Sequence, residues 1–293
     1  MRAWPRRRSR LQIVLALAVG AGLGLLVGLR LGWIAGLAAG LPVAGGYYWL
    51  VMRRFLRRRR LVREPFPEAW RAPLNRCVGF YRGLDQAGRA RFENDIRFFL
   101  AEQRIYGPRG APVDDEIRVL AAAGAAMLGH GLPDWEWPRL RDIVVYPAAF
   151  DSEYRVGRGK GTLGMVHHQG PIIFSADDLR LGFCNPEDGL NVGLHELAHV
   201  MDLEDGAADG VPAGLGFVAA APWLEVVADR LKKVRKGRRR RVLRRYAGTN
   251  EAELFAVAVE VFFEKPDRLK QRDPELYEML AGFFNQDPAG SKG

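Results

Sequence analysis

Cysteine is scarce in this sequence: the 293 residues contain only two, Cys77 and Cys184. One possible pair in a chain of this size excludes the disulfide framework of a small secreted domain. We therefore expect two free thiols and a folded part that works in a reducing compartment. Histidine is scarce as well, with five in the chain, so two histidines at metal-ligand spacing carry information.

Acidic residues and lysine are absent from residues 1–60, which contain twelve arginines. The whole chain has a formal net charge of +10, so the remaining residues carry a small net negative charge. The basic character therefore belongs to the N-terminal segment. This distribution disfavours a nucleic-acid-binding protein, in which the basic residues would cover the folded part.

Charged residues are also missing from two runs inside that segment, residues 11–29 and 31–52. Each run is long enough to cross about 30 Å of hydrocarbon as a helix. We predict a hairpin of two transmembrane helices as a membrane anchor over residues 1–60. Its arginine-rich flanks, "RRRSR" and "RRFLRRRR", predict that both ends face the cytoplasm at a bacterial-type inner membrane. A single span and a cleaved signal peptide are the alternatives; no small-residue cleavage site follows the first run.

The rest of the chain, residues 61–293, predicts one domain of the α+β class that is mostly α. Apolar spacing typical of helices runs through "QAGRARFENDIRFFLAEQRIYG" and "DDEIRVLAAAGAAMLGHGL", and returns from Leu190 onward. Between them, "RDIVVYPAAF", "GKGTLGMVHH" and "GPIIFSADD" predict a small β-sheet. The "GPIIFS" strand is expected in the core; as an exposed edge it could instead bind an extended peptide.

The segment "NVGLHELAHVMDLEDG" contains His195 and His199 with Glu196 between them. Residues four apart lie on one face of a helix, so both imidazoles can bind one ion. Zinc accepts such nitrogens, and a neighbouring glutamate can act as general base toward a water. Two buried histidines without a ligand would be costly in this apolar segment. We predict one zinc ion (Zn2+) per chain, which needs a third ligand from elsewhere.

Glu253 and Glu260 are the main candidates for that ligand. They lie seven residues apart in "TNEAELFAVAVEVFFEKP" and share a helical face, so the residues alone leave them level. Asn250 and Glu253 also form a possible N-capping pair, which gives Glu253 a purely structural alternative.

Several segments together resemble the Mlc titration factor A family of zinc-dependent peptidases: "HELAHVMD", "DGAADGVP", "RRYAGTNEAELFAVAVEVFFEKP" and "LYEMLAGFFNQDP", with "FPEAW" and "DIVVYPAAF" upstream. The similarity covers most of residues 64–288. It implies a zincin-like (gluzincin) fold with aminopeptidase-type activity. In such a site zinc is bound by His195, His199 and Glu253, Glu196 is the catalytic base, and Tyr246 lies at the active site. The best-known member binds a glucose-responsive repressor, so a regulator protein is a further partner that the resemblance implies.

The sequence departs from the family pattern at three places. The anchor stands outside the pattern, Leu197 replaces a common phenylalanine, and Phe174-Ser175-Ala176 replaces Leu-Ser-Trp. The last change removes a large aromatic side chain and so affects substrate preference more than catalysis. Tyr246 has two interpretations: its phenol donates a hydrogen bond to an oxyanion, or it packs at the end of a basic helix.

Other polar residues near the motif have weaker cases. Asp202 is a candidate hydrogen-bond acceptor for a ligand imidazole, or else a solvated acid at a helix end. Asp205 and Asp209 lie among glycines and are expected to support turns. Three histidines are excluded as ligands: His130, His167 and His168.

A basic run extends from Arg230 to Arg245, with eleven positive residues and no acid. A solvated helix face is the first interpretation, contact with anionic lipid the second, and nucleic acid the least favoured. The leading hypothesis for the whole chain is a membrane-anchored zinc metallopeptidase that hydrolyses peptide or protein substrates. The alternative is a zinc-containing binding module that sequesters a transcriptional regulator or other partner at the membrane.

Overall fold

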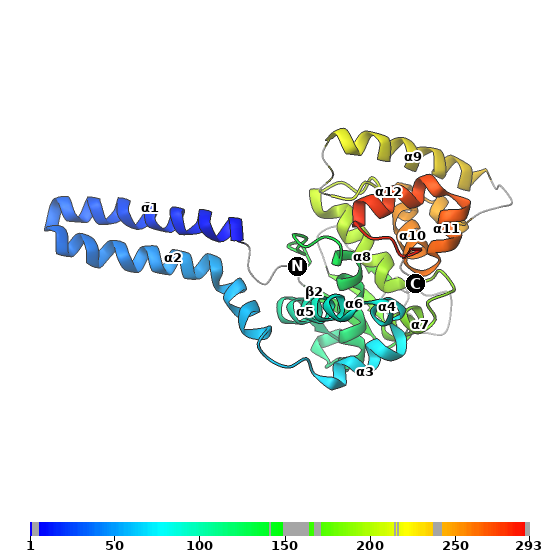
Figure 1. Ribbon diagram of the computed structural model, residues 1–293, viewed down its shortest axis with the longest axis horizontal. Helices are drawn as coiled ribbons and strands as arrows, with labels where there is room; N and C mark the ends of the chain where they lie inside the picture. The colour runs from blue at the N-terminus through cyan, green and yellow to red at the C-terminus, as the bar shows by residue number, and fades with distance from the viewer. Residues whose placement is uncertain are drawn as a thin grey trace. The chain divides into compact units, whose positions relative to one another are not determined.

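The computed structural model describes residues 1, 6–140, 142–148, 164–166, 171–213, 215, 217–236 and 242–290. The chain divides into two compact units, one of residues Arg2–Pro65 and the other of Phe66–Gly293 with Met1. The N-terminal unit is a pair of helices, and the larger unit contains the sheet and all the residues of the predicted site (Figure 1).

The N-terminal unit consists of α1 (Arg6–Leu31) and α2 (Trp33–Leu61), which turn back on each other at Gly32. Gly32 has a φ of 93°, a left-handed conformation that favours glycine. The two helices are long and apolar enough to cross a membrane, with mean hydropathies of 2.2 over Leu11–Leu31 and 1.4 over Trp33–Leu61. The structure thus confirms two separate apolar helices, each of which contains most of one of the two predicted runs.

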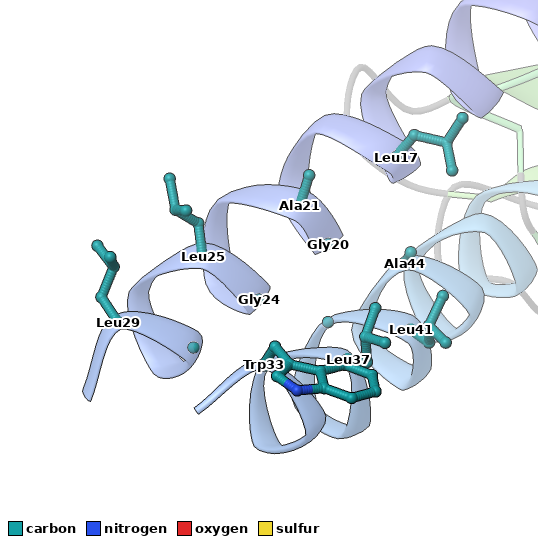
Figure 2. Close-up of a pocket in the computed structure, with 13 residues that line it drawn as sticks. Leu17, Gly20, Ala21, Gly24, Leu25, Leu29, Trp33, Leu37, Leu41 and Ala44 are labelled. Atoms are coloured by element: carbon teal, nitrogen blue, oxygen red, sulfur yellow. The ribbon is translucent and has the colours of Figure 1, made fainter. Parts of the chain in front are cut away.

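Glycine lets these two helices touch through their backbones. A Cβ atom at Gly20 would lie 2.7 Å from the carbonyl oxygen of Gly40, and one at Gly36 would lie 2.4 Å from that of Gly24. Small residues at helix interfaces are typical of membrane helices, because they permit close backbone approach. An apolar groove of about 590 Å³ follows the pair, with leucines and Trp33 along its sides (Figure 2).

The larger unit begins with three helices, α3 (Glu68–Cys77), α4 (Gly79–Gly83) and α5 (Gln86–Glu102). A fourth helix, α6 (Asp115–Gly129), follows the first strand of the sheet. Asp114 caps the start of α6, because its carboxylate accepts a hydrogen bond from the N–H of Ile117 at 2.8 Å. From Val119 to Gly129 every residue of α6 is buried, so this helix forms the centre of the core, as its apolar sequence predicts.

Within the described residues the sheet has four strands in the order β1-β2-β4-β3: β1 (Arg104–Tyr106), β2 (Asp142–Tyr146), β3 (Gly164–Val166) and β4 (Ile172–Ser175). Strands β1, β2 and β4 are parallel, and β3 runs antiparallel to β4. Strand β4 is an interior strand, so the alternative that it is an exposed edge is wrong. The helical interpretation of the segment through "QRIYG" is also wrong at its end, because residues 104–106 pair with β2.

In the part of the chain that the structure describes, six helices follow the sheet: α7 (Ala176–Cys184), α8 (Val192–Asp202), α9 (Phe217–Arg235), α10 (Glu251–Glu264), α11 (Pro266–Arg272) and α12 (Pro274–Phe284). Short 3-10 turns lie at η1 (Pro108–Gly110), η2 (Leu203–Asp205) and η3 (Arg245–Gly248). Helix α8 contacts α6, α7 and α10 inside the unit (Figure 1). The larger unit is therefore mostly helical with one small sheet, as the sequence predicts.

The two cysteines are bonded, and the expectation of two free thiols is wrong. Cys77 at the end of α3 forms a disulfide with Cys184 at the end of α7, 107 residues later in the chain. Residue spacing could not reveal this pairing, because it depends on how α3 and α7 pack. The bond ties these helix ends together beside the helix that carries the histidines.

Candidate active site

Helix α8 brings the two motif histidines to one face. Its first turn is capped by Asn191, whose side-chain oxygen accepts a hydrogen bond from the N–H of Leu194 at 3.1 Å. The apolar residues of α8 after Val192 are buried against the core. On the remaining face, His195 and His199 lie with their Nε2 atoms 3.2 Å apart, as the spacing predicts.

Helix α10 supplies the carboxylate that meets them. The Glu253 Oε2 atom lies 3.1 Å from Nε2 of His195 and 3.6 Å from Nε2 of His199. Asn250 caps α10 by accepting a hydrogen bond from the N–H of Glu253 at 2.8 Å. The capping interpretation and the ligand interpretation are therefore compatible, because the cap uses the backbone of Glu253 and leaves its side chain at the histidines.

These three side chains fit a metal ion. One ligand atom from each of His195, His199 and Glu253 lies within 4.8 Å of the others. Two imidazoles and one carboxylate are a donor set that zinc prefers, and three protein ligands leave a fourth position open. The charges agree with this fit: burial lowers the pKa of His195, but hydrogen bonds with Glu253 and Glu260 outweigh burial and raise it to about 9. The cluster therefore favours a positive charge at its centre.

Glu260 has a different position from Glu253, although the two residues lie on the same helix. Its Oε1 atom lies 2.6 Å from Nδ1 of His195, the ring nitrogen opposite the cluster, and its side chain is 1% exposed. The geometry thus separates the two glutamates that the sequence alone left level. Glu253 joins the cluster, whereas Glu260 contacts His195 from behind.

Glu196 is buried next to the cluster on α8. Burial raises its pKa to about 7, with the charges of Glu253 and Glu260 raising it further and His195 opposing them. A carboxyl group whose pKa lies near neutral can both accept and release a proton at physiological pH.

Tyr246 lies on η3, and its hydroxyl donates a hydrogen bond to Oε1 of Glu253 at 3.1 Å. Its side chain is 51% exposed, which disagrees with a role in packing alone. Partial burial of the side chain and the charge of Glu253 raise its pKa to about 12. The hydroxyl therefore keeps its proton at neutral pH and remains a hydrogen-bond donor.

Arg244 is a residue of the site that the sequence does not single out. It belongs to the basic run, where it is one of eleven cations, yet its guanidinium donates to both carboxylate oxygens of Glu260, at 2.6 and 2.9 Å. The only sequence signal is its place two residues before Tyr246. That signal is weak, because an arginine in a basic run is more often solvated.

The remaining candidates lie apart from the cluster. Asp202 is buried and accepts a hydrogen bond from the N–H of Gly210 at 3.2 Å, so Glu260 rather than Asp202 accepts from a cluster imidazole. Asp205 and Asp209 accept hydrogen bonds from backbone N–H groups two residues later, which confirms their predicted role in turns. His130 contacts Arg91 elsewhere in the unit. His167 and His168 lie outside the described residues.

The basic run is used in more than one way. Arg230 pairs with Asp273, its Nε atom lying 2.6 Å from the carboxylate, and Arg235 donates to the carbonyl oxygens of Gly248 and Thr249. Lys232 and Lys233 on α9 are exposed. Residues 237–241 of the run lie outside the described residues.

Comparison with known proteins agrees with the geometry. The sequence model of the family described as "Glucose-regulated metallo-peptidase M90" matches residues 52–285. The chain is 30% identical over 260 residues to the uncharacterised protein slr2042 of Synechocystis sp., which covers 83% of this chain and 92% of that protein. It is 28% identical over 246 residues to Mlc titration factor A of Cronobacter sakazakii (76% and 87% covered) and 27% identical over 246 residues to that of Escherichia coli (76% and 86% covered). The chain therefore belongs to the glucose-regulated metallo-peptidase family M90, a family that implies a metal and a peptidase function.

Proposed function

We propose that this chain is a membrane-anchored zinc metallopeptidase with a gluzincin-like site. The observation that carries the proposal is the convergence of His195, His199 and Glu253 on one point, beside the buried carboxyl group of Glu196. The first three residues would hold the zinc ion. When bound, zinc would polarise the scissile carbonyl and make a water molecule more acidic.

Glu196 would move the protons of the reaction. It takes a proton from the attacking water and later delivers it to the leaving amine. Its pKa of about 7 suits both steps, because the carboxylate is available as a base and the protonated form is accessible as an acid. Zinc would lower this pKa somewhat by its charge, which favours the base form at the start of the reaction.

Tyr246 would stabilise the oxyanion that forms at the scissile carbonyl. Its hydroxyl is protonated, partly exposed and already at the cluster, where it donates to Glu253. One donor of this kind contributes roughly 3–4 kcal/mol to transition-state stabilisation. We expect the phenol to leave Glu253 for the substrate when the site is loaded.

A binding module is the second candidate, and the relatives favour it. Several of them are named Mlc titration factor A, a name that refers to binding of another protein. In this alternative the metal holds the fold while the domain sequesters a transcriptional regulator at the membrane. Both candidates require zinc, so metal content alone does not separate them.

The experiment is metal analysis and peptide-library cleavage on the full chain in detergent, with Glu196→Gln as the matched control. We expect about one zinc per chain in both forms, cleavage by the wild type, and turnover at least about 10²-fold lower in the variant. Cleavage positions in the library also test the aminopeptidase-type activity that the family resemblance implies. A protein that neither binds zinc nor cleaves any peptide would refute the proposal. Zinc without cleavage in the wild type would favour the binding module.

We further propose residues 1–60 as the anchor and residues 61–293 as the peptidase domain, facing the cytoplasm. The arginine-rich ends of both helices support this orientation. The cysteines no longer support it, because a disulfide persists best in an oxidising compartment. Reporter fusions at the C-terminus distinguish a cytoplasmic from a periplasmic peptidase domain. Activity of a periplasm-specific reporter would exclude the cytoplasmic orientation.

We also propose that exposed cations of the basic run, Lys232 and Lys233 among them, contact anionic lipid. Their exposure on α9 supports this, and each contributes roughly 1 kcal/mol near such a surface. Flotation with vesicles of phosphatidylglycerol against vesicles of phosphatidylcholine tests the idea on a protein without residues 1–60. Equal binding to both vesicles would count against it.

A further inference from the structure

Behind His195, on the side opposite Glu253, the structure contains a buried group of hydrogen bonds that the proposed reaction does not use. Glu260 lies at its centre, with Oε1 at 2.6 Å from Nδ1 of His195. Arg244 donates to Oε1 at 2.6 Å and to Oε2 at 2.9 Å. The backbone N–H of Asn191 donates to Oε2 at 2.8 Å. Three elements therefore meet at one carboxylate: the start of α8, the end of α10 and the residue before η3.

The carboxylate of Glu260 depends on these donors. A buried and unpaired carboxylate is costly, whereas a bidentate arginine and a backbone N–H satisfy both of its oxygens. The guanidinium of Arg244 has a second acceptor besides Glu260, because it also donates to the carbonyl oxygen of Gly189 at 3.3 Å. Its hydrogen bonds thus run into the protein, which distinguishes it from an arginine that binds substrate.

The hydrogen bond with Glu260 determines which ring nitrogen of His195 is available to a metal ion. A carboxylate oxygen can only accept, so the hydrogen bond to Glu260 places the imidazole proton on Nδ1. Nε2 faces a second carboxylate, with Oε2 of Glu253 at 3.1 Å, and its proton is the one that would leave on metal binding. Nε2 would then offer its lone pair, while Nδ1 keeps the proton that it donates to Glu260. Among the described residues, no carboxylate hydrogen-bonds the other ring nitrogen of His199, whose Nε2 atom lies 3.2 Å from His195 and 3.6 Å from Glu253.

Arg244 also reaches the proposed oxyanion donor. Its guanidinium carbon lies 5.7 Å from the centre of the Tyr246 ring, within the range of a cation–π contact. One residue thus contacts both the carboxylate behind His195 and the ring of Tyr246.

We infer that Glu260 and Arg244 are a pair of positioning residues: Glu260 fixes the tautomer and orientation of His195, and Arg244 holds Glu260 in place. The inference rests on the proposed function, since it concerns a ligand of the proposed zinc site. Partners of this kind increase metal affinity without touching the metal.

Arg244→Ala is the more discriminating variant, because loss of positioning and loss of charge would change the zinc affinity in opposite directions. Removing a positive charge near a cation site strengthens cation binding by electrostatics alone. Loss of positioning weakens it. We expect Arg244→Ala to bind zinc about 10-fold more weakly than the wild type, measured on the full chain in detergent by competition with a chromophoric chelator.

Arg245→Ala is the matched control, because it removes the same charge from the neighbouring, exposed residue. Its zinc affinity should be unchanged or slightly higher. Equal or tighter zinc binding by Arg244→Ala would overturn the inference. If Arg244→Ala does not fold, Arg244→Lys replaces it. This variant keeps the charge but cannot bind both oxygens of Glu260 through one planar group. We therefore expect its zinc affinity to lie between those of the wild type and Glu260→Gln. An unchanged affinity in Arg244→Lys would then overturn the inference.

Glu260→Gln tests the other member of the pair, with Glu264→Gln as its control one turn further along α10. We expect a loss of about 10- to 100-fold in zinc affinity for Glu260→Gln and little change for Glu264→Gln. If Arg244 acts through Glu260, the double variant should bind zinc as weakly as Glu260→Gln alone; independent, multiplied losses would refute this coupling. Failure of the wild type to bind zinc would refute the proposed function itself, whereas normal zinc binding by Glu260→Gln would refute only the positioning role.

Discussion

Glu253 and Glu260 are the same residue type on the same helix, and they meet opposite nitrogens of one histidine. Their spacing of seven residues predicts a shared face, and both side chains do point toward α8. Which nitrogen each one reaches depends on how α10 lies against α8, a property of tertiary packing. Local spacing was therefore enough to propose His195, Glu196 and His199 as site residues. It could not predict which ring nitrogen of His195 each glutamate contacts, nor that Arg244 lies in the site.

Tyr246→Phe removes one hydroxyl and leaves the ring in place. If the phenol donates to the oxyanion, turnover should fall by about 10²- to 10³-fold, while zinc content stays the same. Turnover on a cleaved peptide and metal content of the same preparation are the two measurements. Equal turnover in both proteins would remove Tyr246 from the mechanism.

Asp202→Asn tests a buried carboxyl group outside the cluster. Burial, together with the charges of Asp209 and Asp205, raises the pKa of Asp202 to about 7 from its usual 3.8. The folded protein thus holds a proton that the unfolded chain releases, so this group's contribution to stability is full below pH 3.8 and falls as the pH rises toward 7. At pH 8 we expect the variant to be more stable than the wild type by on the order of 1–3 kcal/mol, with little difference at pH 4.

Urea unfolding with a metal chelator in all samples measures this difference, because the titration of the metal-free histidines is then common to both proteins. Asp205→Asn, at an exposed residue nearby, is the control and should show no such pH-dependent gain. The predicted role of Asp202 would be contradicted if the difference in free energy of unfolding between the wild type and Asp202→Asn were the same at pH 4 and pH 8.

At the scale of elements, helices were easier to predict than strands. The long apolar periodicities that predict α5, α6, α8 and α10 extend over several turns, so each contains enough repeats to be recognised. Strand β1 has three residues and directly follows α5, and it exists because β2 lies beside it. The sequence of these three residues does not indicate that they pair with a strand almost forty residues later in the chain.

The close contact of α7 with α8 makes a further prediction about an element. A Cβ atom at Gly193 would lie 2.8 Å from the Phe183 ring and 2.9 Å from Leu179. Gly193→Ala should therefore lower the free energy of unfolding by about 1–3 kcal/mol through overpacking. Gly282→Ala, in α12, meets nothing within 4 Å and should instead stabilise the protein by roughly 0.5–1 kcal/mol. Urea unfolding of both variants checks the opposite signs.

At the scale of the whole molecule, the disulfide is the one covalent link between distant parts of the larger unit. Cys184 is exposed, so serine replaces it without leaving a cavity. Without reductant, Cys184→Ser should lower the free energy of unfolding by about 2–5 kcal/mol, because the bond closes a loop of 107 residues. With dithiothreitol, the wild type should fall to the stability of the variant. Equal stability of the two proteins without reductant would show that the bond does not form.

Composition predicted a separate N-terminal segment, since the arginines and apolar runs of residues 1–60 differ so clearly from the rest, and the structure contains a compact unit of residues Arg2–Pro65. It did not predict the disulfide, because two cysteines carry no spacing pattern. The family resemblance supplied the choice of Glu253, which the geometry then separated from Glu260 on independent grounds.

The glycine contacts between α1 and α2 have a genetic consequence. Insertion into a bilayer depends on the hydropathy of each helix, whereas the pairing of these two depends on the absence of side chains at Gly20, Gly24, Gly36 and Gly40. A change from glycine to alanine at these positions increases hydropathy and blocks close approach at the same time. Mutational tolerance in this hairpin should therefore follow side-chain volume rather than polarity. For the proposed membrane anchor, a screen could recover alleles that still insert but have lost the paired arrangement of the two helices.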